Sequence, residues 1–419
     1  MIHISDKAKC CGCLACVNAC PAQCIVPRRD REGFNYPVAN PDLCINCGKC
    51  EKVCPVQNPM EPREPIQAYA ARSSASTTTT AKAANTTSTA RTANTANSAN
   101  AVTSARTSSG GIFPLLATKF IDEGGVVYGA AFSPDLTVEH IEVTDKEGLE
   151  KLKGSKYVQS ELYSAYEEIR DYLQDNKKVM FTGTPCQIAG LKKYLGNQTE
   201  GLFTVEVACH GVPSPGLWEK YIKAFEETHR CKIKSVNFRD KSQSWRHYDV
   251  VYEVEKTESA SKERSTVRVS AEDEIFISLF RQDMTLRPSC YNCPARNGRS
   301  GSDITLADLW SVHKVAPHMD DDKGASLVLL NSERGKALFE TLEIEEICKV
   351  DPSEAMTENG GFATAVQMPQ KREEFFKGVH STKNLLKYMK GYVIRTPLHK
   401  KIYRKIRRTL SKMKRRLIK

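Results

Sequence analysis

The sequence lacks any apolar run long enough to cross a membrane, and residues 1–10 lack the apolar core of a secretory signal. A spanning helix needs about 20 apolar residues, whereas the longest candidates, such as residues 124–132, are half that length and contain glycine. A Rossmann glycine fingerprint is also missing, so a dinucleotide would have to bind through another loop geometry. Because free cysteines persist in reducing compartments, sixteen cysteines without a secretion signal predict a cytoplasmic protein.

The C-terminal tail, residues 399–419, contains no acidic residue, and its basic residues account for the net charge of +11. Residues 399–419 hold eleven Lys and Arg, so the rest of the chain is formally neutral and offers no basic surface for nucleic acid. Apolar residues recur in the tail at helical spacing, at Ile402, Ile406, Leu410, Met413 and Leu417. The pattern predicts a basic amphipathic tail over 391–419. We favour its association with an anionic membrane at the inner face over docking on an acidic partner or a plain solvated helix.

Residues 71–109 have no acid, glycine, proline or aromatic residue and consist almost wholly of Ala, Ser, Thr and Asn. Such a stretch cannot bury enough apolar area to offset the entropy of ordering it. The composition predicts a low-complexity linker or tolerated insertion over 67–109.

Cysteine is abundant, and eight cysteines form two runs that share one spacing and are each followed by proline. The runs are Cys10, Cys13, Cys16 and Cys20, then Cys44, Cys47, Cys50 and Cys54. This is the bacterial ferredoxin spacing for [4Fe–4S] clusters, in which the fourth cysteine of each run ligates the other cluster. We therefore assign Cys54 to the first cluster and Cys20 to the second, in a domain over 1–66.

A disulfide scaffold or structural zinc fits the two runs less well, because zinc sites use four ligands in two pairs. Cys11 and Cys24 fall outside the spacing and are predicted to be small buried thiols.

Four further cysteines stand at the ends of predicted elements, at Cys186, Cys209, Cys290 and Cys293. Thr184 and Pro185 are a natural N-cap and first helical residue, which places Cys186 in a first turn that favours a thiolate. The four could hold a third [4Fe–4S] cluster or a structural zinc; alternatively, the Cys290–Cys293 pair could be a redox dithiol. Spacing alone does not separate these hypotheses.

The remaining pattern mixes strands and helices. Strands are predicted over 126–132, 137–143, 178–182, 202–209, 235–239 and 248–254, with the first two paired, and helices over 160–173, 188–195 and 217–228. The fold class is therefore α+β: a mixed α/β catalytic domain over 110–390 behind an N-terminal bacterial ferredoxin-like domain.

Several motifs between residues 108 and 340 resemble the beta subunit family of coenzyme F420 hydrogenases and dehydrogenases. They are "SSGGIFPLLA", "GGVVYGAAF", "KGSKYVQS", "FTGTPCQIAGLKKYL", "ACHGVPSPGLWEKYI", "CYNCPARNGRSGSDITLADLW" and "KGASLVLLNSERG". The resemblance implies FAD beside an iron–sulfur cluster, and it favours the third cluster. It also implies electron exchange with a two-electron acceptor, which is coenzyme F420 in some members. Bacterial relatives occur in surface-polysaccharide gene clusters.

The resemblance also suggests which residues contact the cofactor. The predicted flavin contacts are Ser109, Gly110, Gly111, Lys156, Thr182, Gly183 and Thr184, and the predicted catalytic residues are Lys156, as a cation near the flavin, and His210, as a proton donor. Each also has a plain interpretation: a helix cap for the "SSGG" turn, a solvated lysine, a turn glycine or a structural histidine. Trp245 is expected to pack in the core, and Asp308 either orients a ligand or caps an element.

The sequence as a whole predicts an iron–sulfur flavoprotein, a ferredoxin-linked oxidoreductase. Its partners would be ferredoxin or another low-potential donor and a small-molecule acceptor. Two alternatives stay open: an electron-transfer subunit that serves a partner enzyme, as in surface polysaccharide synthesis, and a cluster-bearing scaffold without flavin.

Deletion of residues 399–419 should remove most binding to anionic membranes, because each cation near such a surface contributes about 1 kcal/mol. Sedimentation with vesicles that contain anionic lipid, compared with vesicles of neutral lipid alone, measures the effect. Undiminished sedimentation of the truncated protein would refute the membrane hypothesis.

Overall fold

The computed structural model describes residues 1–73, 107–257, 263–362 and 364–394. Most of the predicted insertion, 74–106, and the amphipathic part of the tail, 395–419, lie outside the described residues. Within these described ranges, no helix is long and apolar enough to span a membrane.

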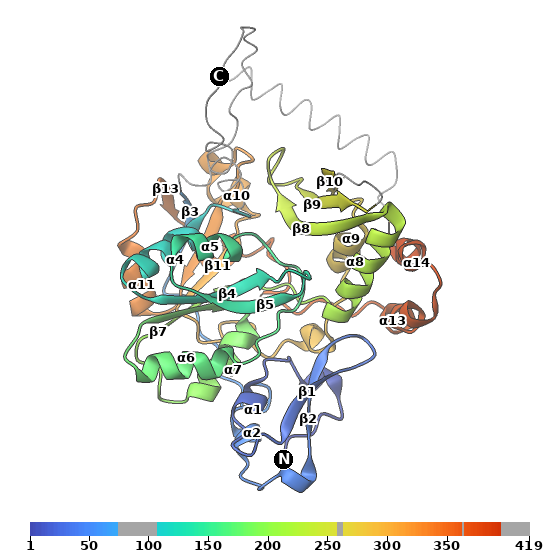
Figure 1. Cartoon of the computed structure of the whole chain (residues 1–419). Coiled ribbons are helices and arrows are strands. Elements are labelled where there is room, and N and C mark those ends of the chain that lie inside the picture. The colour runs from blue at the N-terminus through green and yellow to red at the C-terminus, as the bar shows by residue number, and fades with distance from the viewer. Residues whose placement is uncertain (74–106, 258–262, 363, 395–419) are drawn as a thin grey trace, which may run out of the picture.

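An eight-stranded mixed sheet forms the centre of the molecule (Figure 1), in the order β13-β3-β12-β11-β7-β6-β4-β5. Its strands are β3 (Gln67–Arg72), β4 (Val126–Phe132), β5 (Val138–Val143), β6 (Val179–Gly183), β7 (Leu202–Val207), β11 (Ile304–Asp308), β12 (Ser326–Leu330) and β13 (Glu346–Lys349). The central strands β4, β6, β7 and β11 run parallel, and the flanking pairs are antiparallel. The predicted pairing of 126–132 with 137–143 is confirmed.

Helices cover both faces of this sheet, because alternate strand residues point to opposite sides. Val127 and Met180 pack under α4 (Ile112–Asp122), α5 (Lys146–Leu152) and α11 (Glu333–Glu340). Their neighbours Tyr128 and Phe181 pack against α6 (Ala165–Gln174) and α7 (Pro185–Leu195). Both layers hold buried apolar side chains, so the sheet is a core element throughout.

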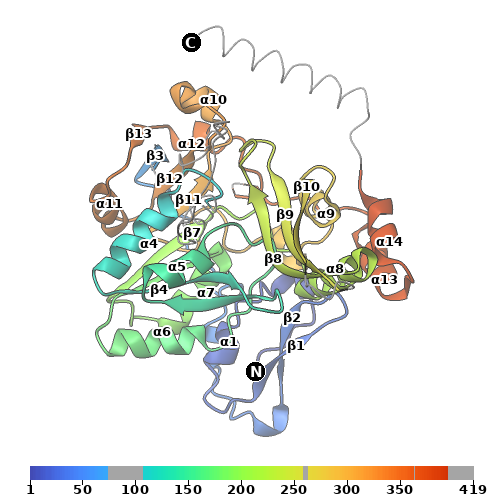
Figure 2. The ribbon, with the colours of Figure 1, turned by 45° about the horizontal axis from the view of Figure 1, so that its top comes forward.

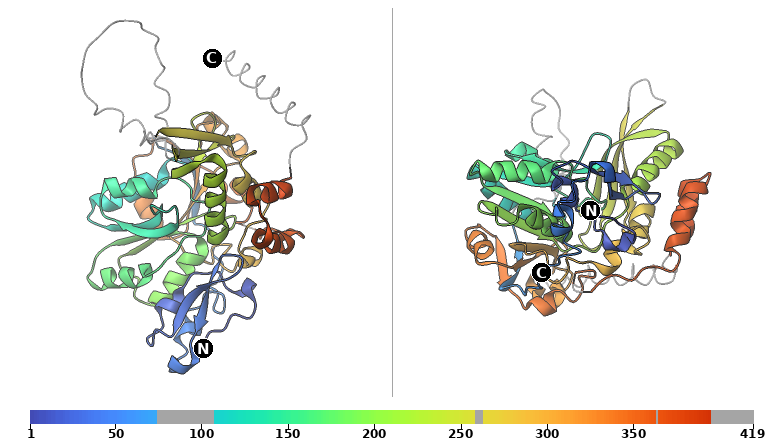
Figure 3. Two further views of the ribbon diagram at one scale, coloured as in Figure 1. Left: turned by 45° about the vertical axis from the view of Figure 1, so that its right-hand side comes forward. Right: turned by 90° about the horizontal axis from the view of Figure 1, so that it is seen from below.

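A second lobe stands beside the sheet (Figure 2) and is built on the antiparallel strands β8 (Cys231–Asp240), β9 (Asp249–Lys256) and β10 (Arg264–Ser270). The helices α8 (Pro215–His229) and α9 (Ile275–Arg281) pack on them around Trp218, Phe238 and Phe276. Two further helices, α13 (Arg372–Ser381) and α14 (Leu385–Tyr392), lie outside α8 (Figure 3). The short remaining elements are η5 (Pro288–Asn292), α10 (Val312–Val315), η6 (Pro317–Met319) and α12 (Pro352–Ala355).

The N-terminal domain is a small two-fold repeat around a hairpin of β1 (Ile25–Arg29) and β2 (Asn35–Ala39). Each half carries a 3-10 turn and a helical turn: η1 (Lys7–Lys9) with α1 (Ala15–Asn18), and η2 (Pro41–Leu43) with α2 (Lys49–Lys52). Left-handed backbone recurs at matching places in the two cysteine runs, at Gly12 and Leu14, then at Asn46 and Gly48. The predicted fold class, mixed α/β with an N-terminal ferredoxin-like domain, is confirmed.

The boundary predicted for the linker is wrong at its start, because residues 67–72 form β3 inside the large sheet. β3 pairs with β12 on one side and β13 on the other. Its sequence, "QAYAAR", is rich in alanine and has no β-branched residue, so local propensity gave no strand signal and non-local pairing decided the structure. Residues 74–106 are therefore an insertion between β3 and α4 rather than a spacer between domains.

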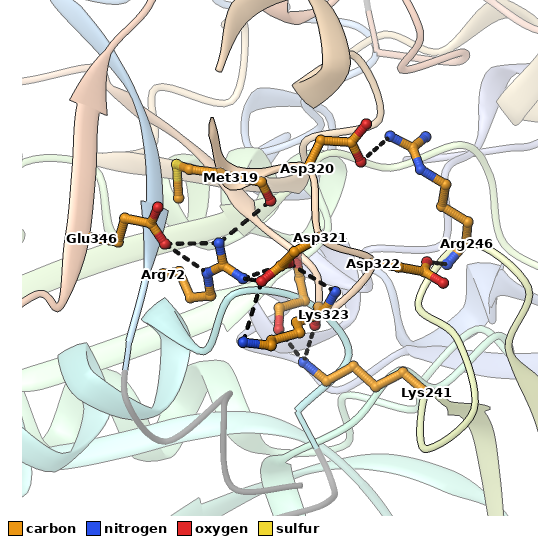
Figure 4. Close-up of polar contacts among 10 residues, drawn as sticks. Arg72, Lys241, Arg246, Met319, Asp320, Asp321, Asp322, Lys323 and Glu346 are labelled. Atoms are coloured by element: carbon orange, nitrogen blue, oxygen red, sulfur yellow. Dashed lines mark hydrogen bonds and ion pairs between the residues drawn. The ribbon is translucent and has the colours of Figure 1, made fainter. Parts of the chain in front are cut away.

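A loop at residues 319–323 holds both ends of this insertion in place (Figure 4). The buried Arg72 donates to Asp321 at 2.7 Å, to Glu346 at 2.7 Å and to the Met319 carbonyl at 3.3 Å. Lys241 joins the same loop to the other end, since its Nζ donates to the carbonyls of Lys323, at 3.0 Å, and Ser109, at 2.6 Å. The turn before α4 is thus fixed independently of the insertion.

The N-terminal domain packs directly on the body of the protein. Cys13 lies against Gly190 in α7, where a Cβ would be 2.7 Å from the Cys13 Cβ. At the hairpin end, Arg372 of α13 donates to Glu32 at 2.6 and 3.0 Å. The domain therefore contacts both lobes.

Replacing Gly190 with alanine should destabilise the protein by about 1–3 kcal/mol, because the added methyl must displace Cys13 in a packed interface. Gly391→Ala is the matched control: it is also a helical glycine, but its Cβ would meet nothing within 4 Å. Anaerobic urea unfolding measures both free energies. Equal effects of the two substitutions would contradict the packing argument.

Candidate redox site

A cavity of about 1420 Å³ lies between the large sheet and the second lobe. Its floor includes Gly183, Val207 and Asp308, the last residues of β6, β7 and β11. Tyr248, which immediately precedes β9, and Phe280 of α9 line it from the second lobe. Ligands of open α/β sheets bind beyond the carboxyl ends of parallel strands, so the fold favours this cavity as the binding site. A single drug-sized ligand fills about 300–1,000 Å³, and this cavity has room for more.

The "SSGG" and "GSKY" motifs meet at the rim of the cavity. Ser108 Oγ accepts hydrogen bonds from the backbone and hydroxyl of Ser155, both at 2.9 Å. Ser109 and Gly111 line the cavity, and Gly111 is the N-cap of α4 with φ of 81°. Gly110 faces the sheet instead: its amide donates to Ser326 Oγ at 3.0 Å and is not free for a ligand.

Lys156 lines the cavity, but its ammonium is committed to the end of α5. Nζ donates to the carbonyls of Lys151, Leu152 and Lys153 at 2.8 to 2.9 Å. These bonds cap the helix and use the three hydrogens of the ammonium group. In this arrangement Lys156 supplies fixed positive charge to the cavity wall.

Thr182, Gly183 and Thr184 line the cavity where β6 turns into α7. Thr184 and Pro185 occupy the predicted N-cap and first helical positions. The Thr184 amide donates to Gln187 Oε1 at 2.9 Å, and its hydroxyl lies 3.3 Å from Cys186 Sγ. The helix start thus presents its first turn, with Cys186, toward the cavity.

His140 also lines the cavity and was missed by the sequence reasoning. Its Nε2 lies 2.9 Å from the Thr182 carbonyl, and its ring stacks on Phe181. A nitrogen that faces a carbonyl carries the proton, so Nδ1 is an acceptor, and it has no partner among the described residues. Burial lowers the pKa of His140 to about 4, so the ring is neutral at pH 7. The available signal was a polar residue at an inward strand position, two residues after Val138.

His210 lies on the cavity wall beside Cys209. Its Nε2 is 2.5 Å from Asp283 Oδ1, and its ring meets Phe280 edge-on. Burial by itself lowers the pKa of His210, but the Asp283 carboxylate outweighs it and the pKa is raised. The arrangement holds one ring orientation, as a proton donor would require.

Trp245 is buried in the core, as predicted, and Trp310 is the indole that lines the cavity. The two rings stack with centroids 4.7 Å apart at 14°. Asp308, at the end of β11, pairs with the Arg239 guanidinium and accepts from Trp245 Nε1 at 3.3 Å. Asp308 therefore fixes side chains beneath the cavity wall.

The third cysteine group, Cys186, Cys209, Cys290 and Cys293, comes together at this wall. Cys186 and Cys209 line the cavity itself. Burial raises the pKa of Cys209 well above its usual range, and the charges of Cys290, Cys186 and Cys293 add to it. Burial likewise raises the pKa of Cys290 to about 12 and of Cys293 to about 11. Within the described ranges, no three His, Cys, Asp or Glu side chains converge on one ion.

The first cysteine group, Cys10, Cys13, Cys16 and Cys54, is buried, with every member at most 9% exposed. Burial raises the pKa of Cys16 to about 12, with contributions from Cys10, Cys54 and Cys50. Burial also raises the pKa of Cys54, and Cys10 and Cys50 again contribute. Two cysteines of the second run, Cys50 and Cys54, thus lie near thiols of the first run.

The second cysteine group, Cys20, Cys44, Cys47 and Cys50, lines one small cavity near the N-terminus. Cys24 lines it as well, with Sγ 3.4 Å from Cys20 Sγ. Cys47 is exposed, and the neighbouring Ile45 is 66% exposed. This group therefore lies at the protein surface, whereas the first group is interior.

Cys11 links the first and third groups. As predicted, it and Cys24 are buried. A hydrogen bond with Cys13 raises the pKa of the Cys11 thiol, and a second hydrogen bond, with Cys186, acts in the opposite direction. Thiols of the N-terminal domain thus touch the cysteine group on the cavity wall.

Comparison with known proteins agrees with this geometry. Residues 176–355 match the family of the C-terminal region of the coenzyme F420 hydrogenase/dehydrogenase beta subunit. Residues 9–58 match the 4Fe-4S dicluster domain. The family predicted from the motifs is confirmed, and the chain is an iron–sulfur electron-transfer protein related to these beta subunits.

Curated relatives match the N-terminal domain. Ferredoxin-1 of Caulobacter vibrioides is 43% identical over 53 residues, 13% of this chain and 42% of that protein. Ferredoxin 7Fe of Hydrogenibacillus schlegelii is 48% identical over 42 residues, 10% of this chain and 47% of that protein. The chain thus spans less than half the length of these relatives.

One solved structure is similar over a longer stretch. A chain from the F420-reducing [NiFe] hydrogenase complex of Methanosarcina barkeri covers 71% of this chain and 91% of its own, with 16% identity and a TM-score of 0.41.

The buried His140 should make stability depend on pH below neutrality. Its pKa is about 4 in the folded protein and about 6.5 when unfolded, so between these values only the unfolded state takes up the proton. Acidification from pH 7 to pH 5 should therefore destabilise the protein by about 2 kcal/mol through this residue. In His140→Gln, the decrease in the free energy of unfolding between pH 7 and pH 5 should be about 2 kcal/mol smaller than in the parent, as measured by anaerobic urea unfolding. Identical pH slopes for parent and variant would contradict the assignment.

Proposed function

We propose that this chain is an oxidoreductase that passes electrons between [4Fe–4S] clusters and a two-electron acceptor, with FAD in the large cavity. The observation that carries the proposal is the third cysteine group, because two of its members line the cavity and the group also touches the N-terminal domain. The third cysteine group thus lies between the N-terminal domain, which we propose carries the electrons, and the cavity, which we propose binds the ligand.

The donor chemistry of the three groups fits iron–sulfur clusters. Each group contains four cysteines, and no carboxylate or imidazole is needed to complete a set. Burial raises the pKa of Cys16 in the first group and of Cys209 in the third, so cluster binding there would release protons and stabilise the fold. We assign the first, second and third groups to three clusters, with the crossed ligands Cys54 and Cys20.

The exposed second group suits contact with an external donor. Cys47 and Ile45 lie at the surface beside the N-terminal hairpin, where the exposed Leu43 and Val38 add apolar area. A low-potential carrier such as ferredoxin could approach this edge closely. We therefore place the partner contact at the second group.

The cavity fits a flavin by size and lining. FAD, when bound, would supply the exchange between single electrons and electron pairs. Thr182, Gly183 and Thr184 would border it on the sheet side, Ser109 and Gly111 at the rim, and Lys156 would provide fixed positive charge. His210, oriented by Asp283, is the residue placed to move a proton, and coenzyme F420 is one candidate acceptor.

The proposal is tested by counting iron and flavin in protein reconstituted under anaerobic conditions. We expect about twelve irons and one FAD per chain, and about eight irons in Cys186→Ala or Cys290→Ala, because each cluster holds four. Cys348→Ala is the matched control, since this cysteine lies on β13 outside all three groups, and it should keep twelve.

The other outcomes separate the alternatives. About eight irons with bound zinc in the parent would remove the third cluster. A parent protein that binds clusters but no flavin would contradict the catalytic proposal and support the alternative of a cluster-bearing scaffold. Bound flavin that is reduced through the clusters but turns over no acceptor in a reoxidation screen would indicate an electron-transfer subunit for a partner enzyme.

A further inference from the structure

We infer that Arg287 is the shared counter-charge of the first and third cysteine groups and sets the reduction potentials of the clusters proposed there. The inference rests on the proposed function, since it assumes clusters at both groups. Arg287 stands three residues before Cys290, at the N-cap of η5. Arg287 would thus be a positioning residue that tunes the potentials of the clusters for electron transfer.

The guanidinium of Arg287 reaches from the body into the N-terminal domain. Nε donates to the Cys10 carbonyl at 2.7 Å, and Nη2 lies 3.6 Å from the Cys10 sulfur. Nη2 also donates to the Asn35 carbonyl at 2.9 Å, and the cation sits 4.2 Å from the centroid of the Tyr36 ring. One side chain thus binds both the backbone and a thiol of the first group.

No carboxylate balances this charge. Arg287 is fully buried, yet in the described part of the chain it forms no ion pair with an acid. By contrast, the buried Arg372 in the same interface is paired with Glu32. A buried charge without a partner is strongly unfavourable, so the anionic groups that balance Arg287 must be sought among its neighbours. Those neighbours are Cys10, Tyr36, Cys11 and Cys290, three of which are cysteines of the first run or the third group or lie beside them.

The surrounding residues leave room for the guanidinium. Gly12, between two cysteines of the first run, has φ of 74°, and a Cβ there would lie 2.7 Å from Arg287 Nη1. Gln159 Oε1 accepts from Nη1 at 3.0 Å. A glycine is therefore required at position 12 both for its backbone conformation and for the approach of Arg287.

The electrostatic consequence follows from the charge of the clusters. A cluster held by four thiolates is anionic and becomes more so on reduction, so a fixed cation within the protein favours the reduced form. Hydrogen bonds to cluster sulfurs act in the same direction, and the Cys10 sulfur is within reach of one. The groups that act most strongly on the pKa of Arg287 include no cysteine of the second group.

Anaerobic redox titration of the reconstituted full-length protein, followed by electron paramagnetic resonance, tests the inference. In Arg287→Met, two of the three reduction steps should move to more negative potential. At a fixed potential, the ratio of reduced to oxidised cluster in these two steps should fall at least tenfold. This corresponds to a shift of about 59 mV in each one-electron reduction potential. The remaining step, from the second group, should stay in place. Arg287→Lys, which keeps the charge, should recover most of the shift.

Arg372→Met is the matched control, because it loosens the same interface without removing a cation from the cysteines. An equal shift in Arg372→Met, or in Arg287→Lys, would overturn the inference by showing that packing is the cause. Unchanged potentials in Arg287→Met with full iron content would also overturn it. If the parent protein itself holds fewer than about twelve irons, the proposed third cluster fails instead, and the iron count shows this separately.

Discussion

The packing of Cys13 against Gly190 is the contact on which the arrangement of the molecule depends. A glycine inside a helix costs about 1 kcal/mol relative to alanine, and here it lets the first cysteine run lie directly on α7. That approach brings the Cys11 thiol to Cys186, so the N-terminal domain and the cavity wall share a continuous set of cysteines. A side chain at position 190 would collide with Cys13.

The three cysteine groups differ in exposure to solvent. The second group lies at the surface with Cys47 exposed, the first group is interior, and the third group lies at a cavity wall. This arrangement suits the proposed function, in which the protein exchanges electrons with a large partner and a small ligand. The partner must come close to one cluster, while the ligand site must be shielded from it. The direct packing of the domains, rather than a pliant linker, produces the order.

The cavity lies between two lobes, and each lobe forms one of its walls. The parallel strands end at its floor, and the three-stranded lobe closes it from the opposite side. Its rim is fixed by the turn before α4, which Lys241 and the loop at 319–323 hold in place. These contacts lie among the described residues on either side of the insertion, and they hold Ser109 at the rim.

Short-range spacing in the sequence is enough to predict several parts of this protein. The 4Fe-4S dicluster domain, the Thr184–Pro185 helix start and the paired strands after α4 follow from local rules of cysteine spacing, capping and alternation, and these predictions are confirmed. Tertiary structure alone decided the rest. Strand β3 forms through pairing with distant strands, Lys156 is committed to a helix end, and His140 and Arg287 gain their roles from burial. Burial and partner choice arise only when segments far apart in the chain meet, so no local pattern records them.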